Sequence, residues 1–67
     1  MKAGEVYQEK NNTWNGRVCY IKLLEYLKND LWRVHAKIKY THSNNKYRYL
    51  EMTGADIKTY FVKVKEA

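Results

Sequence analysis

The chain has 67 residues, with 13 Lys and Arg against seven Asp and Glu and a formal net charge of +6. At this length a domain buries only about 60% of the surface of its unfolded chain, so a small core is expected and a large enzymatic cleft is not. One cysteine, Cys19, excludes an internal disulfide, and two separated histidines provide no zinc framework. We therefore expect one domain over residues 1–67, stabilised by apolar packing, with no cofactor and no metal.

The sequence carries no sign of export or membrane insertion. The stretch MKAGEVYQEK has no apolar run after its lysine, and no segment approaches the roughly 18 apolar residues of a spanning helix. The cytoplasm is the expected location, where a reduced Cys19 is ordinary.

The composition of the whole chain favours strands over helices. Seven Tyr, two Trp and one Phe, with no Pro, favour strands. Residues 4–9 are predicted to form a strand, and KNNTWNG a polar loop in which the asparagines and Gly16 tolerate turn geometry. Residues 17–27 fit two alternatives, because their apolar residues recur at threes, as in a helix, and also fill both parities of a strand. We favour the strand, since β-branched and aromatic residues cluster at its start and the turn KND follows at once.

The clearest element covers residues 32–41, where apolar and polar side chains alternate throughout. HSNN supplies a hairpin turn, residues 46–53 return as a strand, and residues 60–64 form a closing strand. Between the last two strands, TGADIKT is predicted to be a tight turn or one helical turn. Thr53 would cap it, and Asp56 would lie near the positive end of its dipole.

Five short, mostly antiparallel strands with one helical turn before the last resemble the SH3-like small barrels, among them KOW, Tudor and archaeal chromatin-type domains. The resemblance rests on element order and on the pieces GEVYQ, WNGRV, LWRV and TGADIKTYF, and the chain lacks the glycine pattern of a KOW signature. It implies an all-β fold, a small five-stranded antiparallel barrel with a short helical turn before the last strand. It also implies a binding module, since such barrels mostly hold nucleic acid or peptides.

Two hairpin registers decide which side chains share a face. In the hairpin of residues 32–41 and 46–53, a two-residue turn would bury Glu51 opposite Ile38. A three-residue turn ending at Asn45 instead sets Leu50 opposite Ile38. We favour the three-residue turn, with Asn45 in the left-handed conformation, because it places Leu50 and Met52 in the core and keeps the Glu51 carboxylate out of it. It turns outward Tyr47, Tyr49 and Glu51, beside Lys37, Lys39 and Thr41.

In the first hairpin, a two-residue Asn-Asp turn sets Ile21 opposite Ile38 and keeps Lys22 out of the core. A three-residue turn would instead set Glu25 opposite Arg33. We favour the first register, and a bulge near Glu25 would reconcile the two.

The favoured registers build a basic face flanked by aromatic side chains. Residues 31–50 hold five basic and no acidic side chains, so this hairpin carries nearly all of the excess charge. Cations release counterions from phosphates and aromatic rings stack on bases, so the face is predicted to bind DNA or RNA with little sequence preference. The alternative is a solvated face whose tyrosines only cover neighbouring side chains. The candidate nucleic-acid-binding residues are Lys22, Arg33, His35, Lys37, Lys39, Tyr47 and Tyr49.

Two other roles compete with nucleic-acid binding. One is a protein-interaction module, such as a small regulatory or inhibitory protein of a phage or mobile element, which docks through a strand edge or an aromatic patch. The other is assembly, in which a homodimer buries Tyr20, Leu24 and Tyr26.

Catalysis is not expected of this chain. His35 and His42 have no Ser, Cys or carboxylate in an identifiable arrangement beside them. Cys19 has inward parity in an apolar strand and is interpreted as a core residue. Trp14 is interpreted as a lid over the end of the barrel, with an exposed anchor for a partner as the alternative.

Overall fold

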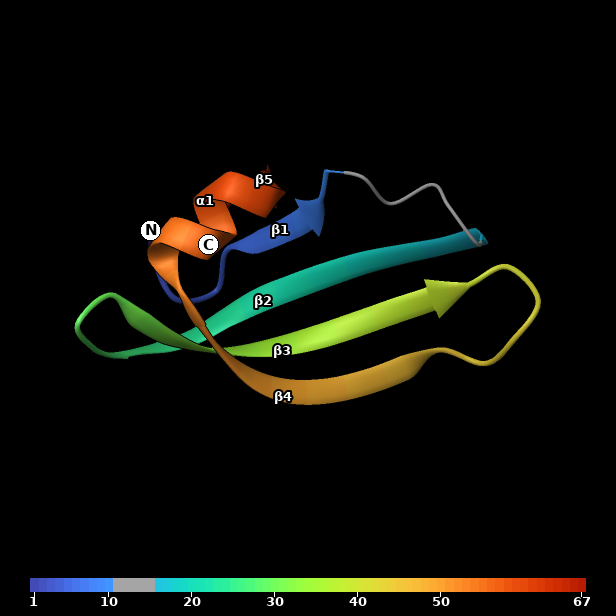
Figure 1. Cartoon of the computed structure of the whole chain (residues 1–67), viewed down its shortest axis with the longest axis horizontal. Helices are drawn as coiled ribbons and strands as arrows, with labels where there is room; N and C mark the ends of the chain where they lie inside the picture. The colour runs from blue at the N-terminus through green and yellow to red at the C-terminus, as the bar shows by residue number, and fades with distance from the viewer. Residues whose placement is uncertain (11–15) are drawn as a thin grey trace.

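The computed structural model describes residues 1–10 and 16–67. Their five strands form one antiparallel sheet in the order β4-β3-β2-β1-β5, with a single helix between the last two strands of the chain (Figure 1). The all-β class and the helical turn before the last strand are thus confirmed. The elements are β1 (Val6–Glu9), β2 (Arg17–Lys28), β3 (Leu31–Tyr40), β4 (Lys46–Thr53), α1 (Gly54–Tyr60) and β5 (Phe61–Lys65).

The predicted strands agree with these bounds to within one residue at each end, except at the start of the first strand, where the difference is two residues. Residues 17–27 form a strand, as favoured, and residues 46–53 form β4 as predicted. The first strand begins at Val6, because Gly4 has a φ of 98° and lies in a turn rather than in extended backbone. The last strand begins one residue late, at Phe61, because α1 continues to Tyr60. Asn11, Asn12, Trp14 and Asn15, to which the sequence assigned turn and lid roles, lie outside the described residues.

The β2–β3 hairpin has the predicted two-residue turn but not the predicted pairing. Asn29 and Asp30 have φ values of 51° and 64°, the left-handed geometry of the turns that suit the twist of paired strands. Two register shifts in β2, one between Leu23 and Glu25 and one before Lys28, each add a residue to that strand. Ile21 therefore pairs with Ala36, and the prediction of Ile38 as its partner is wrong. The predicted bulge beside Glu25 is confirmed. It sets Glu25 opposite Arg33 and Tyr26 opposite the core residue Trp32, so the favoured register, which puts Tyr26 beside Arg33, is wrong for these two residues.

The β3–β4 hairpin keeps the predicted faces while differing in register. Ile38 pairs with Lys46 instead of Leu50, a shift of four residues, because the connection is longer than a three-residue turn. Asn45 is also not left-handed, since Asn29 and Asp30 are the non-glycine residues with positive φ in the described part of the chain. An even shift leaves every side chain on its original side of the sheet, so the predicted division into faces holds.

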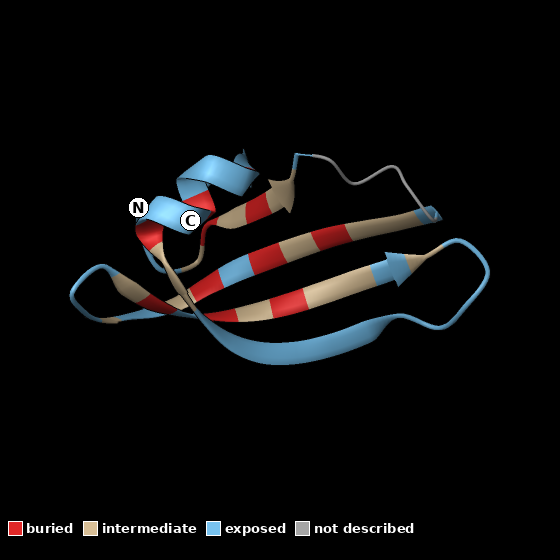
Figure 2. Ribbon diagram, in the orientation of Figure 1, coloured by how far each residue is buried: buried red, intermediate tan, exposed pale blue. Residues whose placement is uncertain are grey.

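The core lies on one side of β2 and β3, where α1, β1 and β5 cover the end of the sheet that is nearer to both termini (Figure 1). Ile21, Leu23, Val34 and Ile57 are almost completely inaccessible. β4, in contrast, is exposed along most of its length on both sides (Figure 2). The buried apolar residues are Tyr7, Cys19, Ile21, Leu23, Trp32, Val34, Ala36, Ile57 and Phe61.

A polar clamp ties the β2–β3 turn to the start of α1. The Asp30 carbonyl oxygen accepts the N–H of Gly54 (2.7 Å), and the Asp30 carboxylate accepts the N–H of Ala55 (2.9 Å). Thr53 caps the helix as predicted, since its hydroxyl oxygen accepts the Asp56 N–H at 3.1 Å. These hydrogen bonds satisfy N–H groups at the start of α1, which have no acceptor within the helix itself.

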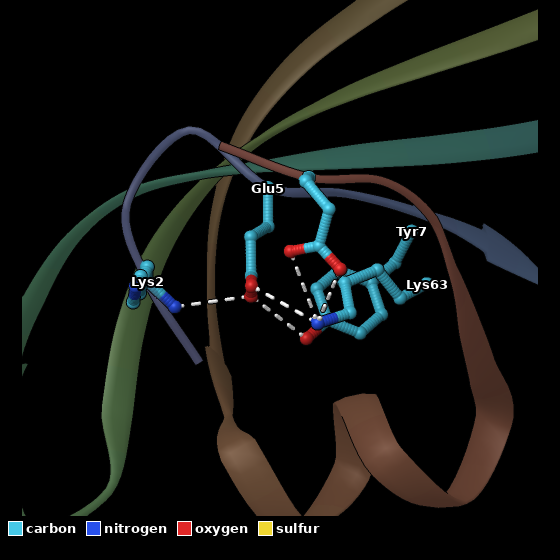
Figure 3. A network of polar contacts seen from close by, with 5 residues as sticks. Lys2, Glu5, Tyr7 and Lys63 are labelled. Atoms are coloured by element: carbon cyan, nitrogen blue, oxygen red, sulfur yellow. Dashed lines mark hydrogen bonds and ion pairs between the residues drawn. The ribbon is translucent and has the colours of Figure 1, made fainter.

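A second polar network joins the N-terminal segment to β5 (Figure 3). The carboxylate of Glu5, only 3% exposed, accepts the backbone N–H of Lys2 (3.0 Å) and the hydroxyl of Tyr7 (3.0 Å). It also pairs with the Lys63 ammonium at 3.2 Å. The Lys2 N–H above all, and then Lys63 and Tyr7, lower the pKa of Glu5 to about 2. Sequence reasoning did not find this network, because Glu5 precedes a strand and has no patterned partner.

Candidate nucleic-acid interface

The side of β2, β3 and β4 that faces away from the core, called the outer face below, is organised in rows across the three strands. One row consists of Tyr20, Lys37 and Tyr47, in which Lys37 lies opposite a tyrosine on each side. Directly opposed side chains on one face of a sheet are close enough to interact. A single cation on the central strand is therefore flanked by two aromatic rings.

The next row consists of Lys22, His35 and Tyr49, and it contains the aromatic cluster of the face. The ring of His35 is parallel to that of Tyr47, with 5.8 Å between centroids and 7° between planes. It also contacts Tyr49, at 4.9 Å and 41°. His35 is partly buried between the two tyrosines, whereas Tyr47 and Tyr49 are 57% and 74% exposed. The tyrosines thus present free ring surface to a ligand.

The third row contains one cation and two carboxylates. Arg33 lies opposite Glu25 on β2 and Glu51 on β4, and its guanidinium forms an ion pair with the Glu25 carboxylate. These two carboxylates offset the charge of Arg33 and mark the acidic end of the outer face. Arg33 is therefore on the predicted face but is the least available of its cations.

The opposite end of the outer face carries free positive charge. Lys39 is exposed, and its ammonium lies 5.9 Å from the centroid of the Tyr20 ring, within cation–π range. In the described part of the chain, Lys22, Lys37 and Lys39 form no ion pair with a carboxylate. All seven predicted residues share one face, and three of them, Lys22, Lys37 and Lys39, form its uncompensated basic region.

Two further cations lie on the other side of β4. Lys46 and Arg48 pair with Ile38 and Ala36, so their side chains have the inward parity of core residues. Both are nevertheless exposed, because the core does not extend beneath β4. Sequence reasoning missed them as binding candidates, although two charges at inward positions are the signal that this strand is open on both sides.

The described residues offer little else in the way of chemistry. Within residues 1–10 and 16–67, no group of three or more His, Cys, Asp or Glu side chains could hold a metal ion. In the same part of the chain, no helix has the length and apolar character needed to cross a membrane. A comparison of this chain with family models finds no match, and searches of curated proteins and of solved structures find none either.

Proposed function

We propose that this protein is a non-enzymatic module that binds nucleic acid through the outer face of β2, β3 and β4. The observation that carries the proposal is the pairing of free cations with exposed aromatic rings. Lys22, Lys37 and Lys39 have no carboxylate partner in the described structure, and Tyr47 and Tyr49 lie beside them with most of their surface exposed. Ammonium groups at phosphates and rings on bases supply affinity without reading sequence.

The same proposal includes an SH3-like barrel as the scaffold. The strand order β4-β3-β2-β1-β5 and the short helix that leads from β4 to β5 support it, since that helix is the connection between the two edge strands of the sheet. Catalysis has no support in the described groups. His35 is occupied by two tyrosines, and burial raises the pKa of the Cys19 thiol, which keeps it protonated and weakly nucleophilic.

The test is a salt titration with charge-matched variants. Binding of a labelled oligonucleotide, single-stranded or duplex, is measured by fluorescence anisotropy at two or more ionic strengths. K37A/K39A should weaken binding and reduce the slope of log K against log salt by about 1.4 for a single strand or 1.8 for a duplex. The control K58A/K65A removes the same charge from two exposed positions on α1 and β5, far from the outer face in the strand order. No binding at low salt, or equal losses in both variants, would overturn the proposal.

A second candidate function is protein binding at the edge of β4, as in a small regulatory or inhibitory protein of a phage or mobile element. The observation that favours it is that β4 ends the sheet and is exposed on both faces, which leaves one row of its backbone groups free to pair with a partner strand. Two results together would support this function instead. The protein would bind no nucleic acid at low salt, and an added protein partner would slow hydrogen exchange at the β4 amides.

Self-association is tested separately. The predicted homodimer would cover Tyr20, Leu24 and Tyr26. Tyr20 is on the outer face, opposite Lys37, whereas Tyr26 packs edge-on against Trp32 on the core side at 5.2 Å, so one flat interface would not cover both tyrosines. Sedimentation at several concentrations gives the mass, and a monomer throughout would exclude this assembly.

A further inference from the structure

We infer that the ligand is a single strand of DNA or RNA, held along β4, in preference to a duplex. This inference rests on the proposed function and names the class of nucleic acid that the same surface would take. It is carried by three features of β4: where its tyrosines lie, how its cations are distributed, and how open the strand is.

The first feature is the position of the aromatic rings. Tyr47 and Tyr49 are two residues apart on one face of β4, so their ring positions are separated by about 7 Å along the strand. In the described structure their hydroxyls form no hydrogen bond, and more than half of each side chain remains exposed beside the His35 contact. Ring faces of this kind bind bases that are already unstacked, whereas the bases of a duplex are stacked on each other and cannot reach them.

The second feature is that cations alternate with the tyrosines along the same strand. Lys46 precedes Tyr47 and Arg48 precedes Tyr49, and these two cations project on the opposite side of the sheet. Neither forms an ion pair in the described part of the chain. The positive charge therefore continues from Lys37 and Lys39 on the outer face, around the edge of β4, to its other face.

The third feature is the edge itself. Two shallow hollows lie along β4, and each is lined by one of the two tyrosines. A flexible strand can follow this narrow edge, with bases on the tyrosine rings and phosphates at the cations on either side. A rigid duplex touches one face only and would leave Lys46 and Arg48 without phosphates. The hollows are lined by Arg33, Tyr49, Leu50 and Glu51, and by Ile38, Tyr40, Lys46, Tyr47 and Arg48.

The experiment compares matched ligands and matched variants. The probes are a mixed-sequence strand of about 16 nucleotides without self-complementarity, as DNA and as RNA, and the DNA duplex of the same length. Affinities are measured by anisotropy for the wild type, Y47A, Y49A and Y49F. Tyr60 is 59% exposed on α1, away from the outer face, and Y60A is the control for removing an exposed tyrosine. A thermal melt verifies that each variant is folded.

The single strands are expected to bind at least tenfold more tightly than the duplex. Y47A and Y49A should each lose about fivefold to a hundredfold of single-strand affinity, with little change for the duplex, while Y49F and Y60A stay near wild type. Equal or tighter duplex binding would overturn the inference, and so would tyrosine variants without effect on the single strands. Either result would leave the proposed function standing if K37A/K39A still weakens binding more than K58A/K65A does. Absence of binding to any probe would refute both.

Discussion

The contact between Gly54 and Asp30 predicts that adding one methyl group will destabilise the protein, and that the effect will reverse when the carboxylate is removed. A Cβ at Gly54 would lie 2.4 Å from one carboxylate oxygen of Asp30 and 3.1 Å from its carboxyl carbon. The carboxylate would have to move away, and its hydrogen bond from the Ala55 N–H would break. Nothing about the backbone of Gly54 itself requires glycine, since its φ is not in the left-handed region.

The magnitude follows from two opposing effects. A hydrogen bond to a charged group contributes about 1.5–3 kcal/mol to stability. Replacement of glycine by alanine at a compatible helical position raises the free energy of unfolding by about 0.4–1 kcal/mol, because the unfolded chain has less conformational freedom. We therefore expect G54A to lower the free energy of unfolding by about 1–2 kcal/mol, a fall in Tm of roughly 5–15 °C for a domain of this size.

The assay is a double-mutant cycle with D30G, followed by thermal and urea unfolding in circular dichroism. Glycine suits the φ of 64° at position 30 and keeps the two hydrogen bonds made by the backbone there, with Tyr26 and Gly54. In the D30G background, G54A meets no carboxylate and should be neutral or stabilising by up to about 1 kcal/mol. Equal destabilisation in both backgrounds would refute the reasoning, because the cost would then arise from something other than Asp30.

Three other outcomes are expected. The pKa of Glu5 lies at about 2 in the folded protein against an ordinary 4.5, so its stabilising effect is complete above about pH 4.5 and is lost as the pH falls toward 2. E5Q should lower Tm at neutral pH and reduce the loss of stability between pH 4.5 and 2. If E5Q loses as much stability over this range as the wild type does, other groups cause the acid sensitivity. L23A, at a fully buried position, should cost about 2–5 kcal/mol in urea unfolding, whereas L50A, at an exposed one, should cost less than about 1 kcal/mol. Cys19 should react slowly with a disulfide reagent until urea unfolds the chain, because the thiol is buried and burial raises its pKa; rapid reaction of the native protein would contradict that placement.

Much of the candidate site could be predicted because the property on which it depends is local. The strict alternation along β3 assigns each side chain to one face of the sheet, whatever strand lies beside it. At the candidate residues the registers differ from the predicted ones by two residues in the β2–β3 hairpin and by four in the β3–β4 hairpin, and even shifts do not exchange faces. Tyr47 and Tyr49 therefore lie beside the β3 cations although their predicted partners were wrong. Between the two bulges of β2 the shift is one residue, so Glu25 and Tyr26 are on the opposite faces from those predicted.

The sequence alone thus determined the strands, the Asn29-Asp30 turn and the sorting of most side chains into two faces, since these depend on residues close together in the chain. Only the tertiary structure decided the pairing partners, because the two bulges in β2 and the length of the β3–β4 connection depend on packing across strands. It alone buried Glu5 against Lys63 and brought Gly54 against Asp30. Each of these contacts joins residues that no local pattern relates, so it exists only once the chain has folded.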